Sequence, residues 1–343
     1  MQPAAHDAAP IYRYRDTLAA VDCLAAAIVH LDLFTLLAHE PLDRAAICRR
    51  LGIAPRPTDV MLTLCAANGL VAADAGGVFR TTPLGREFLV AGAARDARPY
   101  YASMAGRPGV DDWLKVLRTD RPANWPGAQG EADWHAAMRT TAFAESFTAA
   151  MDCRGRVLAP AAAAAIDLGA SRRLLDVGGG SAVYAIACVE AAPALRATVL
   201  EADPVADIAR RTVARAGHAD RIDVTSADMF ADDWPEGHDL HLFANVLHDW
   251  DEPDCRRLLA MSAARLPSGG RIVVADMFLA DAKDGPLWAA EYSVLLASVT
   301  QGRLYTPAEI AGWIADLGLA IVRHAPLPLG RGLLEIARPA GAA

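Results

Sequence analysis

The chain has 343 residues, a formal net charge of −8, and a composition that is 53% hydrophobic and 22% charged. At roughly 100–200 residues per domain, this length suggests two domains, and the apolar share excludes disorder along the whole chain. Because proteins that neutralise phosphates carry a basic face, the acidic balance disfavours a nucleic-acid partner.

The first third of the chain predicts helices followed by a small hairpin. Apolar residues recur at helical spacing over residues 16–38, and two shorter helical patterns cover residues 43–51 and 57–69. The Gly76-Gly77 pair between two short apolar stretches then indicates a hairpin turn. Helix, turn, helix and hairpin together predict a winged helix.

A winged helix can bind DNA or serve as a dimerisation module. Residues 1–110 contain 11 arginines, no lysine and 10 acidic residues, with no basic stripe. The long apolar pattern over residues 16–38 offers more apolar surface than one small domain needs. We therefore predict a homodimer formed through this region, and keep a DNA-binding regulator as the remote alternative.

The second half alternates short apolar strands with helices, which indicates an open, mostly parallel α/β sheet. Two further strand patterns near the C-terminus, LAIVRHAPL and GLLEIARP, predict a closing antiparallel hairpin. The five preceding strand patterns cover residues 172–177, 197–201, 222–228, 238–246 and 270–278.

Ligand-binding signals follow the first three of these strands. Gly178, Gly179 and Gly180 come directly after a buried strand and before a helix, where glycines let a ligand approach the backbone. Glu201 ends the next strand, 23 residues after Gly178, at the place where an acid accepts hydrogen bonds from a ribose. Each feature alone fits a tight turn or a helix cap, but three successive strand ends together indicate a nucleoside site.

The third strand end carries Asp228, Met229 and Phe230, an acid and apolar residues suited to an adenine. The turn does not match the G-x-G-x-x-G pattern of dinucleotide sites, and it has no P-loop lysine. The sequence therefore favours a ligand with one adenosine and no pyrophosphate.

Five ordered segments, DVGGGSA, VLEADPV, SADMF, NVLHDWDE and LPSGGRIVVAD, resemble the class I S-adenosylmethionine-dependent O-methyltransferases of the plant caffeate and bacterial hydroxyarene type. The resemblance implies a winged-helix-like dimerisation domain at 1–110, a helical linker contributing to the substrate pocket at 111–170, and a Rossmann-like methyltransferase domain at 171–343. It also implies that Gly178 and Gly180 line the methionine end of S-adenosylmethionine. Glu201 would then hold the ribose, and Asp228 and Met229 the adenine; the product is S-adenosylhomocysteine.

His248 is the chemical candidate, because methyl transfer to a hydroxyl needs removal of the acceptor proton by a group that titrates near neutrality. The resemblance implies that His248 is the general base and that Asp276, at a strand end, orients it. The alternatives are a His-Asp pair that caps the helix over residues 253–265 and a strand-end cap at Asp276. No further ligand cluster accompanies His248, so we predict no metal.

Two positions depart from the family pattern. Ala182 stands where glycine is common, and Leu304 replaces a glutamate that would flank the histidine. Leu304 leaves open a C- or N-methyltransferase, or an S-adenosylmethionine-dependent enzyme that does not methylate. The favoured function is O-methylation of a small aromatic or polyketide-like metabolite, in secondary metabolism such as antibiotic biosynthesis.

The acceptor pocket has candidates on two helical segments. Apolar residues at helical spacing are also the pattern of plain core, and a solvent-facing Glu291 is the ordinary alternative. The candidates are Phe143, Phe147, Met151, Trp288, Glu291, Tyr292 and Leu295.

The chain also carries signals about compartment. The first ten residues lack a cationic region followed by an apolar run, and no uncharged apolar stretch reaches about 20 residues. The six cysteines are scattered without a CxxC pair. We therefore expect no signal peptide, no membrane span, reduced thiols and a cytoplasmic location.

Overall fold

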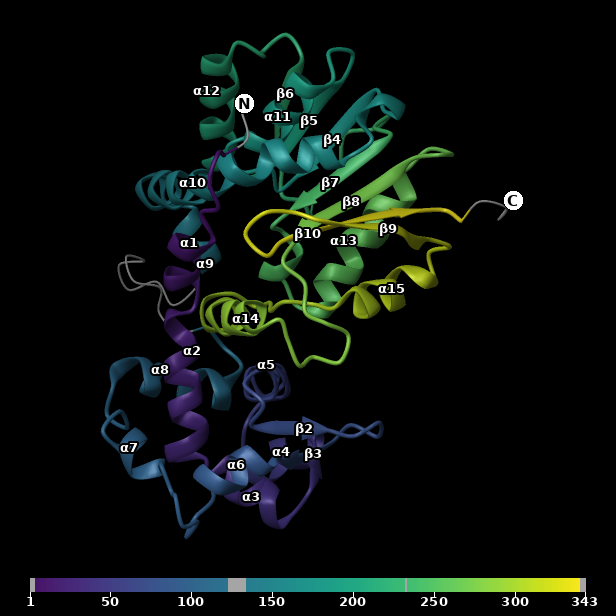
Figure 1. The fold of residues 1–343 in the computed structure, drawn as a ribbon. Coiled ribbons are helices and arrows are strands. Elements are labelled where there is room, and N and C mark those ends of the chain that lie inside the picture. The colour runs from purple at the N-terminus through teal and green to yellow at the C-terminus, as the bar shows by residue number, and fades with distance from the viewer. Residues whose placement is uncertain (1–3, 123–133, 232, 340–343) are drawn as a thin grey trace. The chain divides into compact units, whose positions relative to one another are not determined.

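The computed structural model describes residues 4–122, 134–231 and 233–339. Its internal contacts form two units (Figure 1). The sheet unit comprises Met1–Tyr12, Pro126–Phe278 and Pro307–Ala343, and the helical unit comprises Arg13–Trp125 and Leu279–Thr306.

The helical unit combines the N-terminal elements with one helix from late in the chain. Helix α1 (Ala9–Asp16) crosses the boundary between the units. The other elements are α2 (Leu18–Ala25), η1 (Ala26–His30), α3 (Leu33–His39), β1 (Leu42–Asp43), α4 (Arg44–Leu51), α5 (Pro55–Ala67), β2 (Val71–Ala73), β3 (Val78–Thr81), α6 (Pro83–Phe88), α7 (Arg98–Ala102), α8 (Pro108–Thr119) and α14 (Leu287–Val299).

The helical pattern over residues 16–38 is confirmed, but the helix is interrupted. A π-helical turn, η1, follows α2, and Asp32 then adopts a left-handed φ of 44° before α3 begins. The interruption keeps the apolar residues inside, since Leu33 and Phe34 are fully buried after it. The one-residue widening of a π-turn changes which face of the chain points to the core.

The predicted helix, turn, helix and hairpin are also confirmed. Asp43 caps α4 by accepting from the Ala46 amide, and Pro55 starts α5, where a missing N–H costs nothing. Strands β2 and β3 pair antiparallel around Gly77, whose φ is 74°. The two-residue strand β1 adds to β3, and it is too short to leave an alternating pattern in the sequence.

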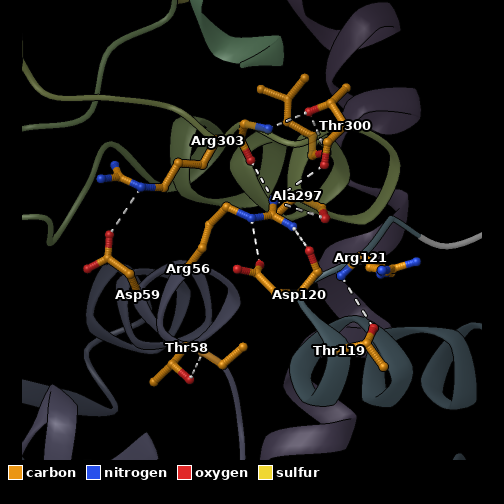
Figure 2. Close-up of polar contacts among 12 residues, drawn as sticks. Arg56, Thr58, Asp59, Thr119, Asp120, Arg121, Ala297, Thr300 and Arg303 are labelled. Carbon is orange, nitrogen blue, oxygen red and sulfur yellow. Dashed lines mark hydrogen bonds and ion pairs between the residues drawn. The ribbon is translucent and has the colours of Figure 1, made fainter. Parts of the chain in front are cut away.

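Helix α14 packs against α2, α5 and α8 of the same unit. Arg56, at the start of α5, binds the C-terminal end of α14 (Figure 2). The guanidinium donates to the carbonyl oxygens of Ala297 (3.3 Å), Thr300 (3.4 Å) and Gly302 (2.7 Å), and its Nε lies 2.8 Å from Asp120 Oδ1. A cation at the C-terminal carbonyls of a helix also complements the helix dipole.

A second polar cluster centres on Asp59, one turn further along α5. Its carboxylate contacts Lys283 (2.7 Å), Arg44 (2.8 Å) and Arg303 (3.5 Å), and Arg303 in turn stacks over Tyr305. These cations lower the pKa of Asp59 although burial opposes them. Figure 2 shows the Arg303 to Asp59 pair beside the Arg56 contacts. The segment Leu279–Thr306 is thus tied to α5 by charge as well as by packing.

The sheet unit is built on a seven-stranded sheet with the order β6-β5-β4-β7-β8-β10-β9 (Figure 1). The first five strands are parallel, and β10 and β9 form the predicted antiparallel closing hairpin. The strands are β4 (Arg173–Val177), β5 (Arg196–Glu201), β6 (Ile222–Ser226), β7 (Leu240–Ala244), β8 (Arg271–Asp276), β9 (Ala320–Pro326) and β10 (Gly332–Ala337). The predicted fold class is confirmed, and the predicted strand bounds differ from the observed ones by up to two residues.

Helices α11, α12 and α13 lie in the connections from β4 to β5, from β5 to β6 and from β7 to β8. Helices α11 and α12 contact β4, β5 and β6, and α10 packs on both helices. The helical segments of this unit are α9 (Trp134–Met138), α10 (Thr141–Ala165), η2 (Leu168–Ala170), α11 (Val183–Ala191), α12 (Val205–Ala216), η3 (Leu247–Asp249), α13 (Glu252–Arg265) and α15 (Pro307–Ala315).

Among the described residues, no single helix is long and apolar enough to cross a membrane. One bent pair of helical segments, Ala9–His30 with Leu33–His39, is long and apolar enough by length and composition alone.

Candidate active site

The glycine turn follows β4 at the carboxyl edge of the sheet. Gly178 and Gly180 adopt φ values of 64° and 57°, in the left-handed region that glycine enters without strain. A Cβ on Gly179 would lie 2.8 Å from Asp176 Cγ and 2.9 Å from Val199, so no larger residue fits there. Ala182 also has a left-handed φ, 71°, which explains why glycine is common at this position of the family pattern.

Glu201 lies beside this turn because β4 and β5 pair in parallel register. Its Oε2 accepts from the Gly180 amide and its Oε1 from the Ala202 amide, both at 2.9 Å. Burial raises the pKa of Glu201 to about 7, against the hydrogen bonds that stabilise the anion. The carboxylate is therefore fixed in orientation and titrates close to neutral pH.

Asp228 and Met229 form the third strand-end group. Asp228 is exposed and its Oδ1 accepts from the Phe230 amide at 2.8 Å. The Met229 carbonyl accepts from the Trp234 indole at 2.9 Å, and the Met229 sulfur lies 3.9 Å from where a Gly178 Cβ would be. The structure thus brings the glycine turn, Glu201 and Met229 together at one edge of the sheet.

His248 and Asp276 form a buried pair at the ends of β7 and β8. His248 Nδ1 lies 2.6 Å from Asp276 Oδ1, and both side chains are 4% exposed. Asp276 Oδ1 also accepts from the Met277 amide at 2.7 Å. The cap of α13 comes from Asp251, which accepts from the Asp254 amide, so the alternative of a His-Asp capping pair is wrong.

The charges around this pair favour a carboxylate next to the imidazole. Burial alone would raise the pKa of Asp276, but the charges of His248 and Arg331 outweigh it and lower the pKa below its usual value. Asp249 Oδ1 lies 3.6 Å from His248 Nε2, and burial raises the pKa of Asp249 to about 6. With Nδ1 donating to Asp276, the lone pair of a neutral ring is on Nε2.

Sequence reasoning missed several polar groups of this site. Arg331 is 2% exposed and lies 3.6 Å from Asp276 Oδ1, and its Nη1 donates to Asn245 Oδ1 at 3.2 Å. Ser181 donates a short hydrogen bond to Asp152 of α10. The sequence offered one signal for these groups, Asn245, which stands three residues before His248 in the segment NVLHDWDE.

The acceptor-pocket candidates divide between the two units, and the pocket stays a prediction. On α10, Phe143 and Phe147 stack with centroids 6.1 Å apart, and Met151 accepts from Arg154. On α14, Trp288, Glu291 and Leu295 are half-buried at the spacing of one helix face, whereas Tyr292 is buried. Glu291 is not a free solvent-facing acid, because Arg13 lies 3.2 Å from its Oε2.

Comparison with protein families decides the class of this protein. The model for an O-methyltransferase domain matches residues 109–320, and that for an O-methyltransferase dimerisation domain matches residues 12–91. The chain belongs to this O-methyltransferase family. It is therefore an S-adenosylmethionine-dependent methyltransferase, and its N-terminal region matches the dimerisation domain of the family.

Individual relatives agree with this assignment. The chain is 35% identical over 300 residues to a 3-hydroxy-5-methyl-1-naphthoate 3-O-methyltransferase of Streptomyces sahachiroi, covering 87% of this chain and 85% of the relative. It is 29% identical over 277 residues to an L-tyrosine C(3)-methyltransferase of Streptomyces lavendulae, covering 80% and 76%.

A solved structure matches over nearly the whole chain. An O-methyltransferase family 2 protein of Planctomyces limnophilus, in complex with apigenin, superposes with a TM-score of 0.89 at 30% identity, covering 98% of both chains.

The residues of the sheet unit fit S-adenosylmethionine. A Cβ would clash at Gly179, and Gly178 and Gly180 have left-handed φ values. Beside this turn lies the fixed carboxylate of Glu201, and Asp228 with Met229 follows the next strand. Among the described residues there is no group of three or more His, Cys, Asp or Glu side chains that could hold a metal ion.

Proposed function

We propose that this methyltransferase acts on a hydroxyl group of a small aromatic or polyketide-like secondary metabolite, with His248 as the general base. The observation that carries the proposal is the 2.6 Å contact between His248 Nδ1 and Asp276 Oδ1 in a buried setting. This contact fixes the ring orientation and stabilises the imidazolium that forms when Nε2 takes a proton.

S-adenosylmethionine supplies a methyl group on a sulfonium, which is already electrophilic. In the proposed step, His248 Nε2 removes the acceptor hydroxyl proton while the acceptor oxygen forms a bond to the methyl carbon. The bond from sulfur to that carbon breaks, and its electron pair stays on sulfur, which leaves S-adenosylhomocysteine. Asp276 remains a carboxylate and holds the protonated ring until the proton passes to solvent.

The cofactor residues are assigned on the same basis. We infer that Gly178 and Gly180 line the methionine end, that Glu201 accepts from the ribose hydroxyls, and that Asp228 and Met229 bind the adenine. Support comes from their place at successive strand ends and from the fixed Glu201 carboxylate.

An aromatic acceptor is favoured by the relatives. The named substrate of one relative is a hydroxynaphthoate, and the superposed structure is a complex with apigenin. Phe143 and Phe147 offer a stacked apolar pair that suits a flat ring. The cytoplasmic location stays a prediction.

Carbon methylation is the second candidate. Two observations favour it: Leu304 is fully buried where the family pattern has a glutamate, and one relative is named as a C(3)-methyltransferase. Incubation with a panel of hydroxyarenes and labelled S-adenosylmethionine, followed by mass spectrometry and NMR of the product, assigns the methylated atom.

The base assignment is tested with His248→Ala. We expect turnover to fall by about 100-fold or more, as loss of a general base does, while S-adenosylhomocysteine affinity changes less than about 3-fold. His324→Ala on exposed β9 of the same unit is the matched control and keeps full turnover. Wild-type turnover in His248→Ala would refute the assignment.

We further propose that the chain is a homodimer. Tyr14, Leu18 and Val21 are 85%, 68% and 49% exposed and follow one another at helical spacing, an apolar stripe that a monomer leaves in water. Leu18→Glu should reduce the mass measured by light scattering to that of one chain. Leu84→Glu, an equally apolar exposed position on α6, should leave the mass unchanged; a dimer in both variants would contradict the proposed interface.

A further inference from the structure

We propose that Arg331 is a positioning residue of the methyl transfer, which links the ends of β7 and β8 by binding Asn245 and Asp276 and so holds His248 in its reactive orientation. This inference rests on the proposed role of His248 and adds a residue that the sequence motifs do not contain. All groups involved lie in the sheet unit.

The turn between β9 and β10 is built to direct Arg331 inward. Leu327 donates its amide to the Arg331 carbonyl at 2.9 Å, and Arg331 donates its own to Pro328 at 3.2 Å. Leu329 and Gly330 both have left-handed φ values, 59° and 66°, which reverse the chain within this tight loop. A leucine in the left-handed region is strained, which is the kind of local distortion that accompanies functional sites.

Strand register then places Arg331 beside the dyad. Gly332 pairs with Asp276 in the antiparallel ladder of β10 and β8. A Cβ on Gly332 would lie 2.9 Å from His324 Nε2 and 3.1 Å from the Phe278 ring, so glycine allows the close approach. Arg331 therefore lies next to Asp276, whose carboxylate accepts the hydrogen bond from His248 Nδ1.

Two contacts define what Arg331 does there. Its Nη1 lies 3.2 Å from Asn245 Oδ1 and 3.6 Å from Asp276 Oδ1. The side chain is 2% exposed, and a guanidinium stays charged in proteins. A buried cation requires a compensating anion, and Asp276 supplies it.

Asn245 extends this link to the strand that carries His248. Its backbone amide donates to the Ala275 carbonyl at 2.9 Å, and its Nδ2 donates to the Tyr184 hydroxyl at 3.0 Å. The Asn245 Oδ1 is thereby directed at Arg331, and the residue has a left-handed φ of 56°. Movement of Arg331 would release both Asn245, three residues before His248 in the chain, and Asp276, which binds the His248 ring.

The charged groups that face the His248 ring come from several elements. Asp276 lies at Nδ1 and Asp249 at 3.6 Å from Nε2. Arg154 of α10 interacts with Asp249 and with Tyr184, and Arg331 interacts with Asp276 and Tyr184. The positive charge of Arg331 offsets part of the negative charge of Asp276. Arg331 therefore weakens the stabilisation of protonated His248 and favours the neutral ring that accepts a proton.

The test compares Arg331→Met with Arg331→Lys and uses Arg323→Met as the matched control. Arg323 lies on β9 of the same hairpin, is 42% exposed and pairs with Glu335 instead. In Arg331→Met we expect kcat to fall by about 10-fold with the acceptor KM changed less than about 3-fold, as misplacement of a base does. The midpoint of the acidic limb of the kcat profile should move to higher pH by about 0.5–1 unit.

Arg331→Lys keeps the charge and should keep that midpoint within about 0.2 units while recovering part of kcat. Arg323→Met should match the wild type in every readout. If Arg331→Met does not fold, Arg331→Gln replaces it in the same comparison. An unchanged midpoint with unchanged kcat, or a loss of kcat that only follows a loss of folded protein, would overturn the proposal.

A measurement without turnover separates this inference from the proposed function. NMR titration of the His248 ring, assigned by the signal missing in His248→Gln, should show protonation at higher pH in Arg331→Met than in the wild type. If His248→Ala kept full turnover, the base assignment would fail while this shift remained. If His248→Ala were inactive and the shift absent, the role of Arg331 would fail alone.

Discussion

The Gly180 amide donates to Glu201 Oε2 over 2.9 Å, which joins the turn after β4 to the end of β5. The turn and the acid are assigned to opposite parts of the cofactor, the methionine end and the ribose. Since the backbone already holds the carboxylate, binding needs little reordering of this side chain.

Glu201, as the proposed ribose ligand, should make cofactor affinity depend on pH. Burial raises the pKa of Glu201 to about 7, so the free protein is mostly protonated at this residue at pH 6 and mostly ionised at pH 8. Ribose hydroxyls bind the ionised form better, so affinity for S-adenosylhomocysteine should rise by about 10-fold from pH 6 to pH 8. Glu201→Gln should bind more weakly at pH 8 and lose most of this dependence in calorimetric titrations.

Asp207→Asn, at an exposed position of α12, is the control and should keep the wild-type dependence on pH. A wild-type affinity that is flat between pH 6 and pH 8 would rule out an ionising Glu201 as the ribose ligand. Buried Asp176, whose pKa is also about 7 because of burial, accounts for any small residual dependence in Glu201→Gln.

Asp276→Asn should move the acidic limb of the kcat profile in the direction opposite to Arg331→Met. Without the anion, protonated His248 loses its partner, so the acidic limb of the kcat profile should move to lower pH and kcat should fall by about 100-fold. Affinity for S-adenosylhomocysteine should stay within about 3-fold, because the proposed cofactor residues do not include Asp276. Asp223→Asn, exposed on β6, is the control. An acidic limb that moves to higher pH in Asp276→Asn would contradict the pairing of His248 with Asp276.

Arg56 should stabilise the helical unit strongly. Its side chain is 12% exposed and binds Asp120 and three carbonyl groups at the C-terminal end of α14 (Figure 2). Arg56→Ala leaves these acceptors unpaired, and the free energy of unfolding in urea should fall by about 2–3 kcal/mol. Arg49→Ala, exposed on α4, should cost less than about 0.5 kcal/mol, and equal losses in both variants would refute the role of Arg56.

The strand ends could be predicted because they obey local rules. Buried strands in a parallel sheet are continuous apolar runs, and the glycines and Glu201 stand at the ends of such runs. Asp228 instead follows β6, an edge strand with a single buried residue. The pairing of His248 with Asp276 was implied by the family pattern and not by the residues alone. The structure supplies its physical basis, since β7 and β8 are neighbours whose carboxyl ends meet.

Arg331 could not be found in this way. It comes 55 residues after Asp276, on a hairpin that joins the sheet antiparallel, and its meaning depends on the register of Gly332 with Asp276. The packing of α14 against α2 and α5 could not be predicted either, because the apolar residues of a helix do not indicate which neighbour covers them. Both cases need contacts between residues far apart in sequence.

His241 should make the sheet unit sensitive to acid. The residue is 1% exposed, its Nδ1 lies 2.7 Å from Ser262 Oγ, and burial lowers its pKa to about 3. The unfolded chain binds a proton near pH 6.5 and the folded one does not, so this contribution to stability is complete above pH 6.5 and is lost as the pH falls towards 3. Between pH 7 and pH 5 the loss amounts to about 2 kcal/mol.

His241→Gln keeps a polar group near Ser262 but does not titrate. Its free energy of unfolding, measured in urea at both pH values, should therefore fall by about 2 kcal/mol less than that of the wild type. His324→Gln, exposed on β9, should lose as much as the wild type. Equal losses in the wild type and in His241→Gln would mean that His241 is protonated in the folded protein at pH 5, and that the buried histidine does not set the acid limit of the fold.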